Sequence, residues 1–520
     1  MTLKKRIVTI LALALCAGGI YGVGRLGITV QQNEEQEIES DSLFGRRETL
    51  YLWYTDEALT DYLNSVVVSY SEYQDDVRVM PVYTSGREYL ETINQASIHS
   101  EEVPDLYIVS NDSLEKAYLA GLASEVRLPE GVLPMADFFP ETAVSAVTYK
   151  EKQIGYPFYF ETSCFLYNET YLKDWAGAQI EAERDAQAAE EAQAQLEREG
   201  EPSEEDEGGT DGDETAAESA ITDEEIQAKV EEALPKTIDD ILAFADVYDA
   251  PEQVEAVFKW DVSDIFYNYF FVGDSIDVGG KNGDQADSIH IYNENAIKCM
   301  RVYQNLNQFF SIDTKEISYD GVLQDFIDGK IVCTVATTDA LSKIEAAVAE
   351  GNFNYEYGVT TVPDVSEELP SASLSVTQCV VVNGYSARKE MANDFAAYLT
   401  GAATDTLYAR TCKLPVHDSG STYDDPDKEA FLQEYMDSIP MPKMIETSNF
   451  WVELEIAFAK IWEGDDANAD LKALSEKIMS QVVGGEYTEE YIDVPEEVAE
   501  AYEDEDMSSD EEAASDEDGE

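Results

Sequence analysis

The first quarter of the chain alternates between short apolar runs and segments with a helical spacing of apolar residues. The expected strands are 50–54, 77–82 and 103–109, and the expected helices that follow them are 56–73, 89–96 and 114–120. In residues 56–73, apolar side chains recur every three or four positions, as they do on one face of a helix. Strands alternating with helices are typical of a parallel sheet covered by helices, so we expect an α/β fold.

Polar residues follow two of these strands directly. Thr55 and Asp56 come after the first strand, and Asn111 and Asp112 come after the third. In open α/β sheets, ligands bind at the carboxyl ends of the strands. These loops are therefore candidate binding loops.

The middle of the chain contains an aromatic-rich extended segment, 154–168, with a single carboxylate, Glu161, at its centre. A buried carboxylate needs a partner, so Glu161 is hard to explain by structure alone. Farther on, 378–383 is an expected strand and 386–399 an expected helix, with Ser386 as its N-cap. Two more helices are expected near the end of the sequence, at 450–462 and 470–482.

The chain is strongly acidic, with 109 Asp and Glu against 33 Lys and Arg in 520 residues and a formal net charge of −76. A surface this negative repels phosphate backbones and argues against nucleic-acid binding. Part of the charge lies in residues 181–230, with 19 acidic and 3 basic residues, and in residues 496–520, with 14 acidic and no basic residues. We interpret 176–235 as an acidic insertion, helical over 172–195 and disordered over 199–222, and 491–520 as a disordered acidic tail.

The N-terminus combines Lys4, Lys5 and Arg6 with an apolar run over 7–23, the pattern of a secretory signal or membrane anchor. Cys16 lies in a segment similar to a bacterial lipobox, although Leu15 stands where that motif has a small residue. Residues 1–25 are therefore expected to be either a lipoprotein signal, lipidated at Cys16, or an uncleaved anchor with an incidental cysteine. In both cases residues 26–47 are a linker, and the body lies on the outer face of the cytoplasmic membrane.

The other five cysteines are far apart, form no C-x-x-C pair and lie mostly in apolar runs. We expect them to be small buried side chains rather than a disulfide framework. The three histidines are also far apart, so the sequence predicts no metal site and no cofactor.

Several short segments, taken in order over about residues 48–485, resemble bacterial extracellular solute-binding proteins of family 1, which include the maltodextrin-binding proteins of ABC transporters. The segments are Leu52-Trp53-Tyr54-Thr55-Asp56, Pro104-Asp105-Leu106-Tyr107, Tyr156-Pro157 with Glu161 and Leu166-Tyr167-Asn168, Asp328-Gly329-Lys330-Ile331, Val381-Val382-Asn383-Gly384 and Leu414-Pro415-Val416. Each segment is weak evidence alone, but their shared order over this length is specific.

The resemblance implies a two-lobed periplasmic-binding-protein-like fold (type II) that closes by a hinge on its ligand. The first lobe is expected to comprise 48–159 and 378–420, and the second 160–370 and 425–490. It also implies no catalysis, a carbohydrate ligand, a monomeric protein and a transmembrane permease as partner.

Recognition of a sugar needs aromatic faces for stacking and carboxylates or amides for hydroxyl groups. The resemblance places such groups at particular positions, and looser candidates are added from the same segments. The candidate ligand-binding residues are Tyr54, Asp56, Asn111, Asp112, Tyr159, Glu161, Trp260, Asp339 and Trp451.

Structural roles compete at several of these positions. Asp56 and Asp112 also suit helix caps. Because Trp53 and Tyr54 alternate on a strand, one of them faces the core, and we favour Trp53. The family pattern has a stacking tryptophan near Asp339, and its absence here argues against a maltodextrin as the specific ligand.

Two other functions are compatible with the sequence. A surface glycosidase would use two carboxylates, which a chain with 109 acidic residues always offers. A surface scaffold or sensor of the same fold, without a role in transport, would better explain the acidic insertion and tail. We favour capture of a sugar or oligosaccharide and its delivery to a permease.

Overall fold

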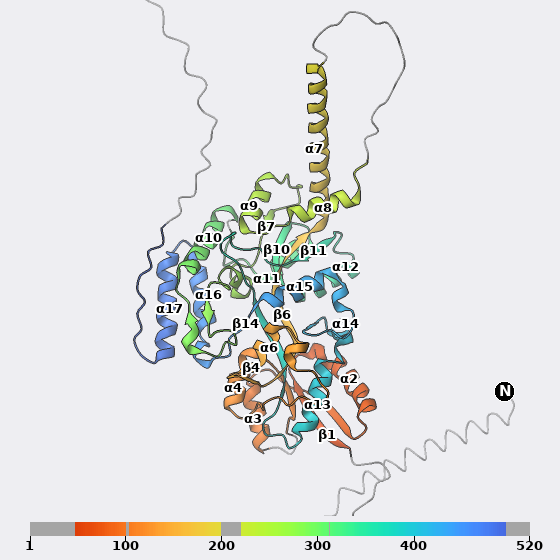
Figure 1. Ribbon diagram of the computed structural model, residues 1–520, viewed down its shortest axis with the longest axis vertical. Coiled ribbons are helices and arrows are strands. Elements are labelled where there is room, and N and C mark those ends of the chain that lie inside the picture. The colour runs from red at the N-terminus through yellow and green to blue at the C-terminus, as the bar shows by residue number, and fades with distance from the viewer. Residues whose placement is uncertain (1–46, 100–102, 199–219, 311, 496–520) are drawn as a thin grey trace, which may run out of the picture. The chain divides into compact units, whose positions relative to one another are not determined.

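The structure is a computed structural model that describes residues 47–99, 103–198, 220–310 and 312–495 (Figure 1). The predicted anchor with Cys16, most of the linker and nearly all of the acidic tail lie outside these residues. Among the helices in these ranges, none combines the length and apolar character needed to cross a membrane.

The main sheet runs in the order β2-β1-β3-β12-β6-β10-β7, with β11 and β13 also paired with β6 and β14 paired with β12. Its strands are β1 (Glu48–Tyr54), β2 (Val77–Tyr83), β3 (Leu106–Ser110), β6 (Tyr156–Asn168), β7 (Ala256–Phe258), β10 (Ile331–Thr337), β11 (Tyr357–Thr360), β12 (Leu374–Val382), β13 (Leu414–Pro415) and β14 (Ile439–Pro440). Two small hairpins pair β4 (Thr148–Tyr149) with β5 (Lys152–Gln153) and β8 (Asp277–Val278) with β9 (Ile289–His290).

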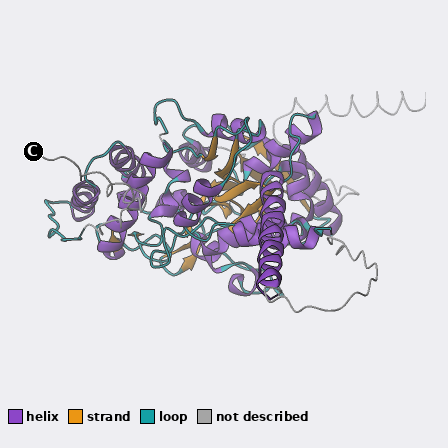
Figure 2. Ribbon diagram, turned by 90° about the horizontal axis from the view of Figure 1, so that it is seen from above, coloured by secondary structure: helices purple, strands orange, loops and turns teal. Residues whose placement is uncertain are grey.

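Helices lie on both sides of the strands (Figure 2). In chain order they are α2 (Thr60–Tyr73), α3 (Tyr89–His99), α4 (Leu114–Leu119), α5 (Met135–Phe138), α6 (Glu141–Val147), α7 (Glu169–Arg198), α8 (Asp223–Ala233), α9 (Ile238–Val247), α10 (Glu294–Phe310), α11 (Tyr319–Ile327), α12 (Asp339–Glu350), α13 (Lys389–Thr400), α14 (Leu407–Thr411), α15 (Pro426–Asp437), α16 (Phe450–Trp462) and α17 (Ala467–Val483). The parallel pairing of β1 with β3 and the helices after β1, β2 and β3 confirm the predicted α/β pattern.

Strand β6 joins the two halves of the sheet. Its first part pairs with β12, from Tyr156 opposite Val380 to Thr162 opposite Ser375. Its second part pairs with β10, from Ser163 opposite Thr337 to Tyr167 opposite Cys333. A strand buried along almost its whole length, with Glu161 half-exposed in the middle, thus brings distant segments beside that carboxylate.

The buried apolar side chains form two clusters. One includes β1, β3, α2 and α13, and the other includes α10, α16 and α17 around Trp260, Tyr303 and Trp462. The first cluster also takes in residues of α11, α12 and α15, so the buried clusters do not follow the expected lobe boundaries, which stay a prediction. Of the described cysteines, four are buried thiols and Cys412 is partly exposed, as expected for residues outside a disulfide framework.

The long helix α7 (Figure 1) covers the first part of the segment 176–235, which the sequence analysis predicts to be an acidic insertion, and it extends slightly beyond the predicted helix at both ends. It contacts α8 through ion pairs between Arg184 and Glu225, at 2.7 Å, and between Lys229 and Glu183, at 3.0 Å. The segment predicted to be disordered lies outside the described residues except at its end, where Thr222 forms a capping box with Glu225. That final residue is therefore ordered by its cap.

Two expectations are wrong, one about where a helix begins and one about where the tail begins. Helix α13 begins at Lys389 and its N-cap position is Arg388, so Ser386 lies outside the helix; its hydroxyl accepts from the backbone N–H of Arg388 at 3.0 Å and donates to Asp105 at 2.5 Å. The tail does not begin at Tyr491: Val494 is buried, and the Arg301 guanidinium donates to the carbonyl oxygens of Val494 and Pro495 at 3.0 and 2.9 Å.

Candidate ligand-binding site

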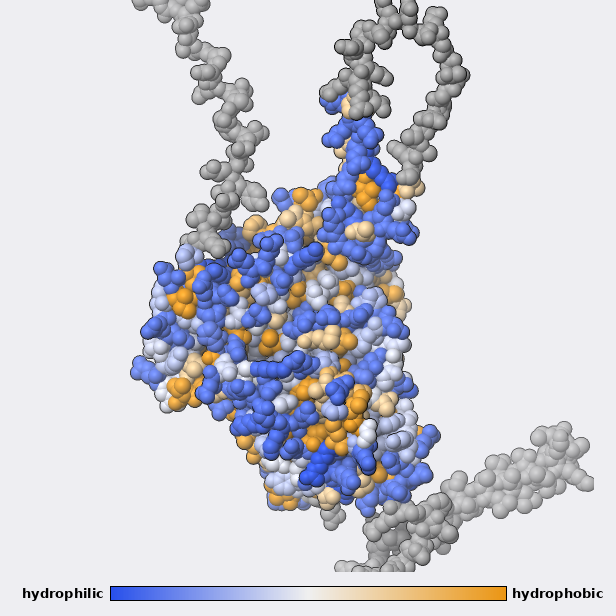
Figure 3. All heavy atoms as spheres, viewed as in Figure 1, coloured by the Kyte–Doolittle hydropathy of each residue, from blue (hydrophilic) through white to orange (hydrophobic). Residues whose placement is uncertain are grey.

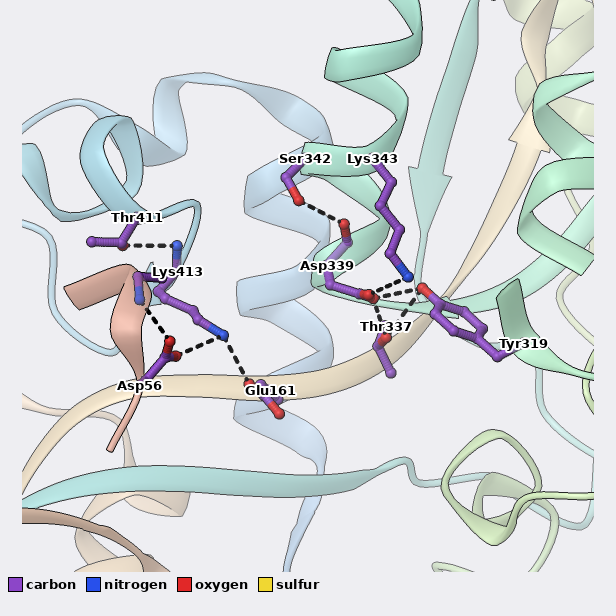
Figure 4. Close-up of polar contacts among 10 residues, drawn as sticks. Asp56, Glu161, Tyr319, Thr337, Asp339, Ser342, Lys343, Thr411 and Lys413 are labelled. Atoms are coloured by element: carbon purple, nitrogen blue, oxygen red, sulfur yellow. Dashed lines mark hydrogen bonds and ion pairs between the residues drawn. The ribbon is translucent and has the colours of Figure 1, made fainter. Parts of the chain in front are cut away.

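Lys413 brings together two of the predicted carboxylates, which are far apart in sequence (Figure 4). Its Nζ lies 3.3 Å from Asp56 Oδ2 and 3.3 Å from Glu161 Oε1. Asp56 also accepts a hydrogen bond from the backbone N–H of Ala58 at 3.0 Å, so it caps the short 3-10 turn Glu57–Leu59 as well. The two roles proposed for Asp56 are therefore compatible.

The backbone explains why Lys413 reaches Glu161. Cys412 ends α14 with a left-handed conformation, φ 57°, and the N–H of Lys413 donates to the Thr411 hydroxyl at 3.1 Å. Strand β13 then pairs with β6 with Leu414 opposite Phe160. In an antiparallel pair, the residue before Leu414 lies next to the residue after Phe160. Lys413 and Glu161 are thus neighbours by register.

The electrostatics of this cluster favour a charged lysine. Burial opposes the ammonium charge, but the carboxylates of Glu161 and Asp56 outweigh it and raise the pKa of Lys413. The ammonium lies 5.6 Å from the ring centroid of Tyr159. Burial, followed by the negative charges of Asp56 and Glu161, holds the pKa of the Tyr159 phenol well above its usual value.

The side chains of Asp56 and Glu161 are 32% and 40% exposed, which leaves both within reach of a ligand. Among the described residues, no partner contacts the second oxygen of Glu161. One lysine shared by two carboxylates leaves one negative charge and a spare acceptor. The cluster suits a ligand that donates hydrogen bonds, such as a polyhydroxyl compound.

Asp339 is the centre of a second polar cluster, at the end of β10. Its Oδ1 accepts from the hydroxyls of Tyr319 and Thr337 at 2.6 and 2.5 Å, and its Oδ2 lies 2.8 Å from Lys343 Nζ. Burial opposes the charge of Asp339, but these three partners outweigh it and hold the pKa of the carboxyl below its usual value. Asp339 is therefore largely occupied by the protein itself.

The two clusters adjoin the same strand. Thr337 pairs with Ser163 on β6, two residues beyond Glu161. Two residues of an extended strand span roughly 7 Å. Figure 4 shows the side chains of both groups beside β6.

Aromatic side chains lie near the Asp339 cluster and beyond it. Tyr267 stacks on Tyr319 with ring centroids 4.6 Å apart, and Lys343 Nζ lies 4.7 Å from the Tyr319 ring centroid. Trp451 is half-buried and packs edge-on against Tyr269 at 5.4 Å. Of the predicted tryptophans, Trp451 is the one that keeps an exposed part.

Three predicted contact residues belong to the core, and these predictions are corrected. Trp260 is fully buried and its indole N–H donates to Asn268 at 2.9 Å. Asn111 is fully buried and uses its amide to bridge Thr377 N and Met441 O. Tyr54 is buried and its hydroxyl donates to Thr60, whereas Trp53 is partly exposed, so the expected inward residue of this pair was also wrong.

The two remaining candidates, Tyr159 and Asp112, lie in different surroundings. Tyr159 is buried to 3% exposure, and the Lys413 ammonium lies over its ring. Asp112 is exposed and accepts a hydrogen bond from Ser110. The sequence analysis missed Lys413 and Tyr319. Lys413 directly precedes the Leu414-Pro415-Val416 segment, but its distance from Glu161 depends on strand pairing that the sequence does not display.

No protein-family model and no curated protein sequence matches the chain. Solved structures do. An extracellular solute-binding protein from Staphylococcus aureus in complex with maltose is 18% identical with a TM-score of 0.61, and covers 84% of this chain and 98% of its own. A cyclo/maltodextrin-binding protein complexed with maltotetraose is 16% identical with a TM-score of 0.63, over 84% of this chain and 98% of its own. A maltose-binding periplasmic protein from Listeria monocytogenes in complex with maltose is 18% identical with a TM-score of 0.61, over 85% and 99%.

This chain therefore has the two-lobed α/β fold of solute-binding proteins. At these identities the likeness concerns the fold, and the ligand has to be argued from the residues of this chain.

Proposed function

We propose that this protein is an extracellular solute-binding protein that captures a sugar or oligosaccharide beside the middle of β6. The observation that carries the proposal is the meeting of Asp56 and Glu161 at Lys413, with acceptor oxygens still exposed. Paired acceptors beside a lysine donor match the hydrogen-bonding needs of vicinal hydroxyl groups. The maltose- and maltotetraose-bound proteins of the same fold support a carbohydrate as the first class of ligand to test.

Delivery of the ligand to an ABC-transporter permease and tethering to the outer face of the cytoplasmic membrane are further parts of the proposal. They rest on the family resemblance and on the basic and apolar N-terminal pattern. A lipidated Cys16 or an uncleaved anchor would serve equally to hold the protein near its permease.

A scaffold or sensor of the same fold is the second candidate. It is favoured by the later part of α7, where Asp185, Glu190 and Glu191 are exposed to solvent and take no part in the sheet. An exposed acidic helix of this kind offers a surface that ligand capture does not need. If the purified protein binds a sugar but cells that produce it do not take that sugar up through a permease, the scaffold or sensor role is favoured over delivery.

The central test is binding of the purified body to a panel of mono- and oligosaccharides, measured by thermal unfolding and Trp fluorescence. A ligand at 100 times its Kd should stabilise the protein by about 2.7 kcal/mol. Trp451 is the predicted contact tryptophan that keeps an exposed part, so Trp451→Phe should reduce the fluorescence change and preserve the thermal shift. If no sugar in the panel gives either response, the carbohydrate assignment is wrong.

The same panel tests the enzymatic alternative. Glycan hydrolysis that is abolished by Glu161→Gln would contradict a pure binding role, because Glu161 would then be acting on a glycosidic bond. Binding without turnover is the expected result.

A further inference from the structure

A large cavity lies away from the candidate ligand-binding site, between α2, α5, α13 and the loop 127–133. Its volume is about 1150 Å³. Tyr156 lines it, five residues before Glu161 on β6, which corresponds to roughly 16 Å of strand. Figure 3 shows hydrophobic side chains gathered over this part of the molecule.

One wall of the cavity is a single face of α13. Glu390, Asp394 and Tyr398 are spaced by four residues and therefore project from the same side of the helix, and all three line the cavity. The opposite side of α13 is apolar and buried, with Phe395 and Leu399 in the core. Because the apolar side of α13 is packed in the core, the side that carries Glu390, Asp394 and Tyr398 has a fixed position in the cavity wall.

The other walls are aromatic and apolar. Tyr73 of α2 stacks on Tyr398 with ring centroids 5.9 Å apart and an interplanar angle of 16°, and Tyr70 lies 5.1 Å from Tyr398. Val132 and Leu133, at the rim, are 43% and 56% exposed. Exposed aliphatic side chains around an aromatic hollow are typical of a surface that binds an apolar group.

The charges in this cavity are not balanced by the protein. The lining residues include three carboxylates, Glu130, Glu390 and Asp394, and one cation, Arg127. In the part of the chain that the structure describes, no ion pair joins Glu390 or Asp394 to a lysine or arginine. Asp394 is half-buried, and burial, followed by the nearby charge of Glu390, raises the pKa of its carboxyl.

Asp394, which is half-buried, and Glu390, which is exposed, have no cationic partner among the described residues and lie in one cavity with stacked tyrosine rings, and this combination favours a positively charged group. Carboxylates attract the charge directly, and the faces of aromatic rings attract cations through their quadrupole. The apolar rim favours a hydrocarbon body attached to that charge. A neutral sugar, by contrast, would leave the carboxylates without a cation.

We propose that this cavity is a second binding site, for a small organic cation that carries an apolar body beside an ammonium group. The site is separate from the proposed carbohydrate site and shares none of the charged residues of that site. The strong negative charge of the whole protein attracts every cation weakly, so the test has to separate this cavity from the general field.

The test uses calorimetric titration of the full chain with three probes of similar shape: phenethylammonium, phenethyl alcohol and 3-phenylpropionate. We expect the ammonium to bind at least about tenfold more tightly than the neutral alcohol, and the anion to bind most weakly, because the three probes differ mainly in charge. The double variant Glu390→Gln/Asp394→Asn should weaken ammonium binding about tenfold. Tyr73→Ala should weaken it about threefold, because the exposed ring supplies a cation–π contact at the rim.

A matched control is available on α7, where Glu181 and Asp185 are also a Glu and an Asp four residues apart and are both exposed. Glu181→Gln/Asp185→Asn removes the same charge from the protein and should leave ammonium binding within about twofold of the parent. Circular dichroism and thermal unfolding check that both double variants fold. Neutralising Asp394 removes an unfavourable buried charge, so we expect no loss of stability.

Three results would overturn the proposal. They are equal binding of the alcohol and the ammonium, an equal loss of binding in the α7 control, and no ammonium binding up to about 10 mM. Glu161→Gln should not change ammonium binding, and Glu390→Gln/Asp394→Asn should not change sugar binding, so failure of this site and failure of the proposed function are distinguishable.

Discussion

The two polar clusters beside β6 neutralise their carboxylates in different ways. At the first, Asp56 and Glu161 share one ammonium, that of Lys413. At the second, Asp339 receives two hydroxyls as well as the ammonium of Lys343, which also pairs with the exposed Asp320. The first cluster therefore keeps carboxylate oxygens that can still accept hydrogen bonds from a ligand, whereas the second keeps almost none. Carboxylates beside the same strand are thus not equivalent: the number of donors that each already has decides which can bind a ligand.

The largest expected effect tests whether Asp339 is structural. Asp339→Ala removes the acceptor that Tyr319 and Thr337 share and one of the two carboxylates at Lys343, and should lower the free energy of unfolding by about 2–3 kcal/mol in urea titrations. Asp320→Ala is the control, because Asp320 pairs with the same lysine but its side chain is 84% exposed. It should cost less than about 0.5 kcal/mol. Equal effects of the two variants would show that Asp339 is not saturated in the way we describe.

The next effect concerns ligand affinity at the first cluster. Once a sugar has been found, Glu161→Gln should raise its Kd about tenfold, because a charged acceptor becomes a neutral one in a partly buried place. The free energy of unfolding should change little. Asp339→Asn should leave the Kd nearly unchanged. If Asp339→Asn weakens binding more than Glu161→Gln, the roles of the two clusters are the reverse of those proposed.

A smaller effect tests the sharing of Lys413. Lys413→Met should lower the free energy of unfolding by about 1 kcal/mol, because two half-exposed carboxylates lose their common cation. The double variant Lys413→Met/Glu161→Gln should be less destabilised than the sum of the single variants, with a coupling of about 0.5–1 kcal/mol. Strict additivity in this cycle would mean that the ion pair contributes nothing in solution.

The smallest effect is the dependence of stability on pH. The pKa of Asp339 is lowered in the folded protein, so its contribution is present above the unfolded value of about 3.9 and is lost as the pH falls through the folded pKa. The pKa of Lys413 is raised, so its contribution is present below the unfolded value of about 10.4 and is lost as the pH rises through the folded pKa. In urea titrations, Asp339→Asn should therefore flatten the acid side of the stability profile and Lys413→Met the alkaline side. The opposite assignment of the two sides would contradict the pKa directions.

Much of the fold could be predicted because its signals are local. The helical spacing of Tyr62, Leu63, Val66 and Tyr70 in the sequence matches the buried face of α2. The same holds at the start of β2, where buried Val77 and Val79 alternate with exposed Arg78. The local pattern led to the wrong inward-facing residue at Tyr54 and Trp53. Alternation shows that one of the two side chains faces the core, but it does not show which one.

The candidate site could be predicted only in part. Glu161 was found because a lone carboxylate in an aromatic strand is anomalous in the sequence itself. Trp260 was assigned to the ligand by residue type and Asn111 by residue type and its place after a strand, but both side chains are buried and hydrogen-bonded inside the protein. Residue type states what a side chain is able to contact, and burial decides what it does contact.

The alternation of strands and helices, the acidic block over 181–230 and the unusual carboxylate at position 161 could all be recognised in the amino-acid sequence. These depend on periodicity and composition, which a chain carries before it folds. Tertiary structure was needed to show that Lys413 joins Asp56 to Glu161, that Asp339 is occupied by its neighbours, and that Glu390 and Asp394 line one cavity with the stacked tyrosines Tyr73 and Tyr398. These depend on strand register and helix packing between segments separated by up to hundreds of residues, and such long-range contacts leave no local mark in the sequence.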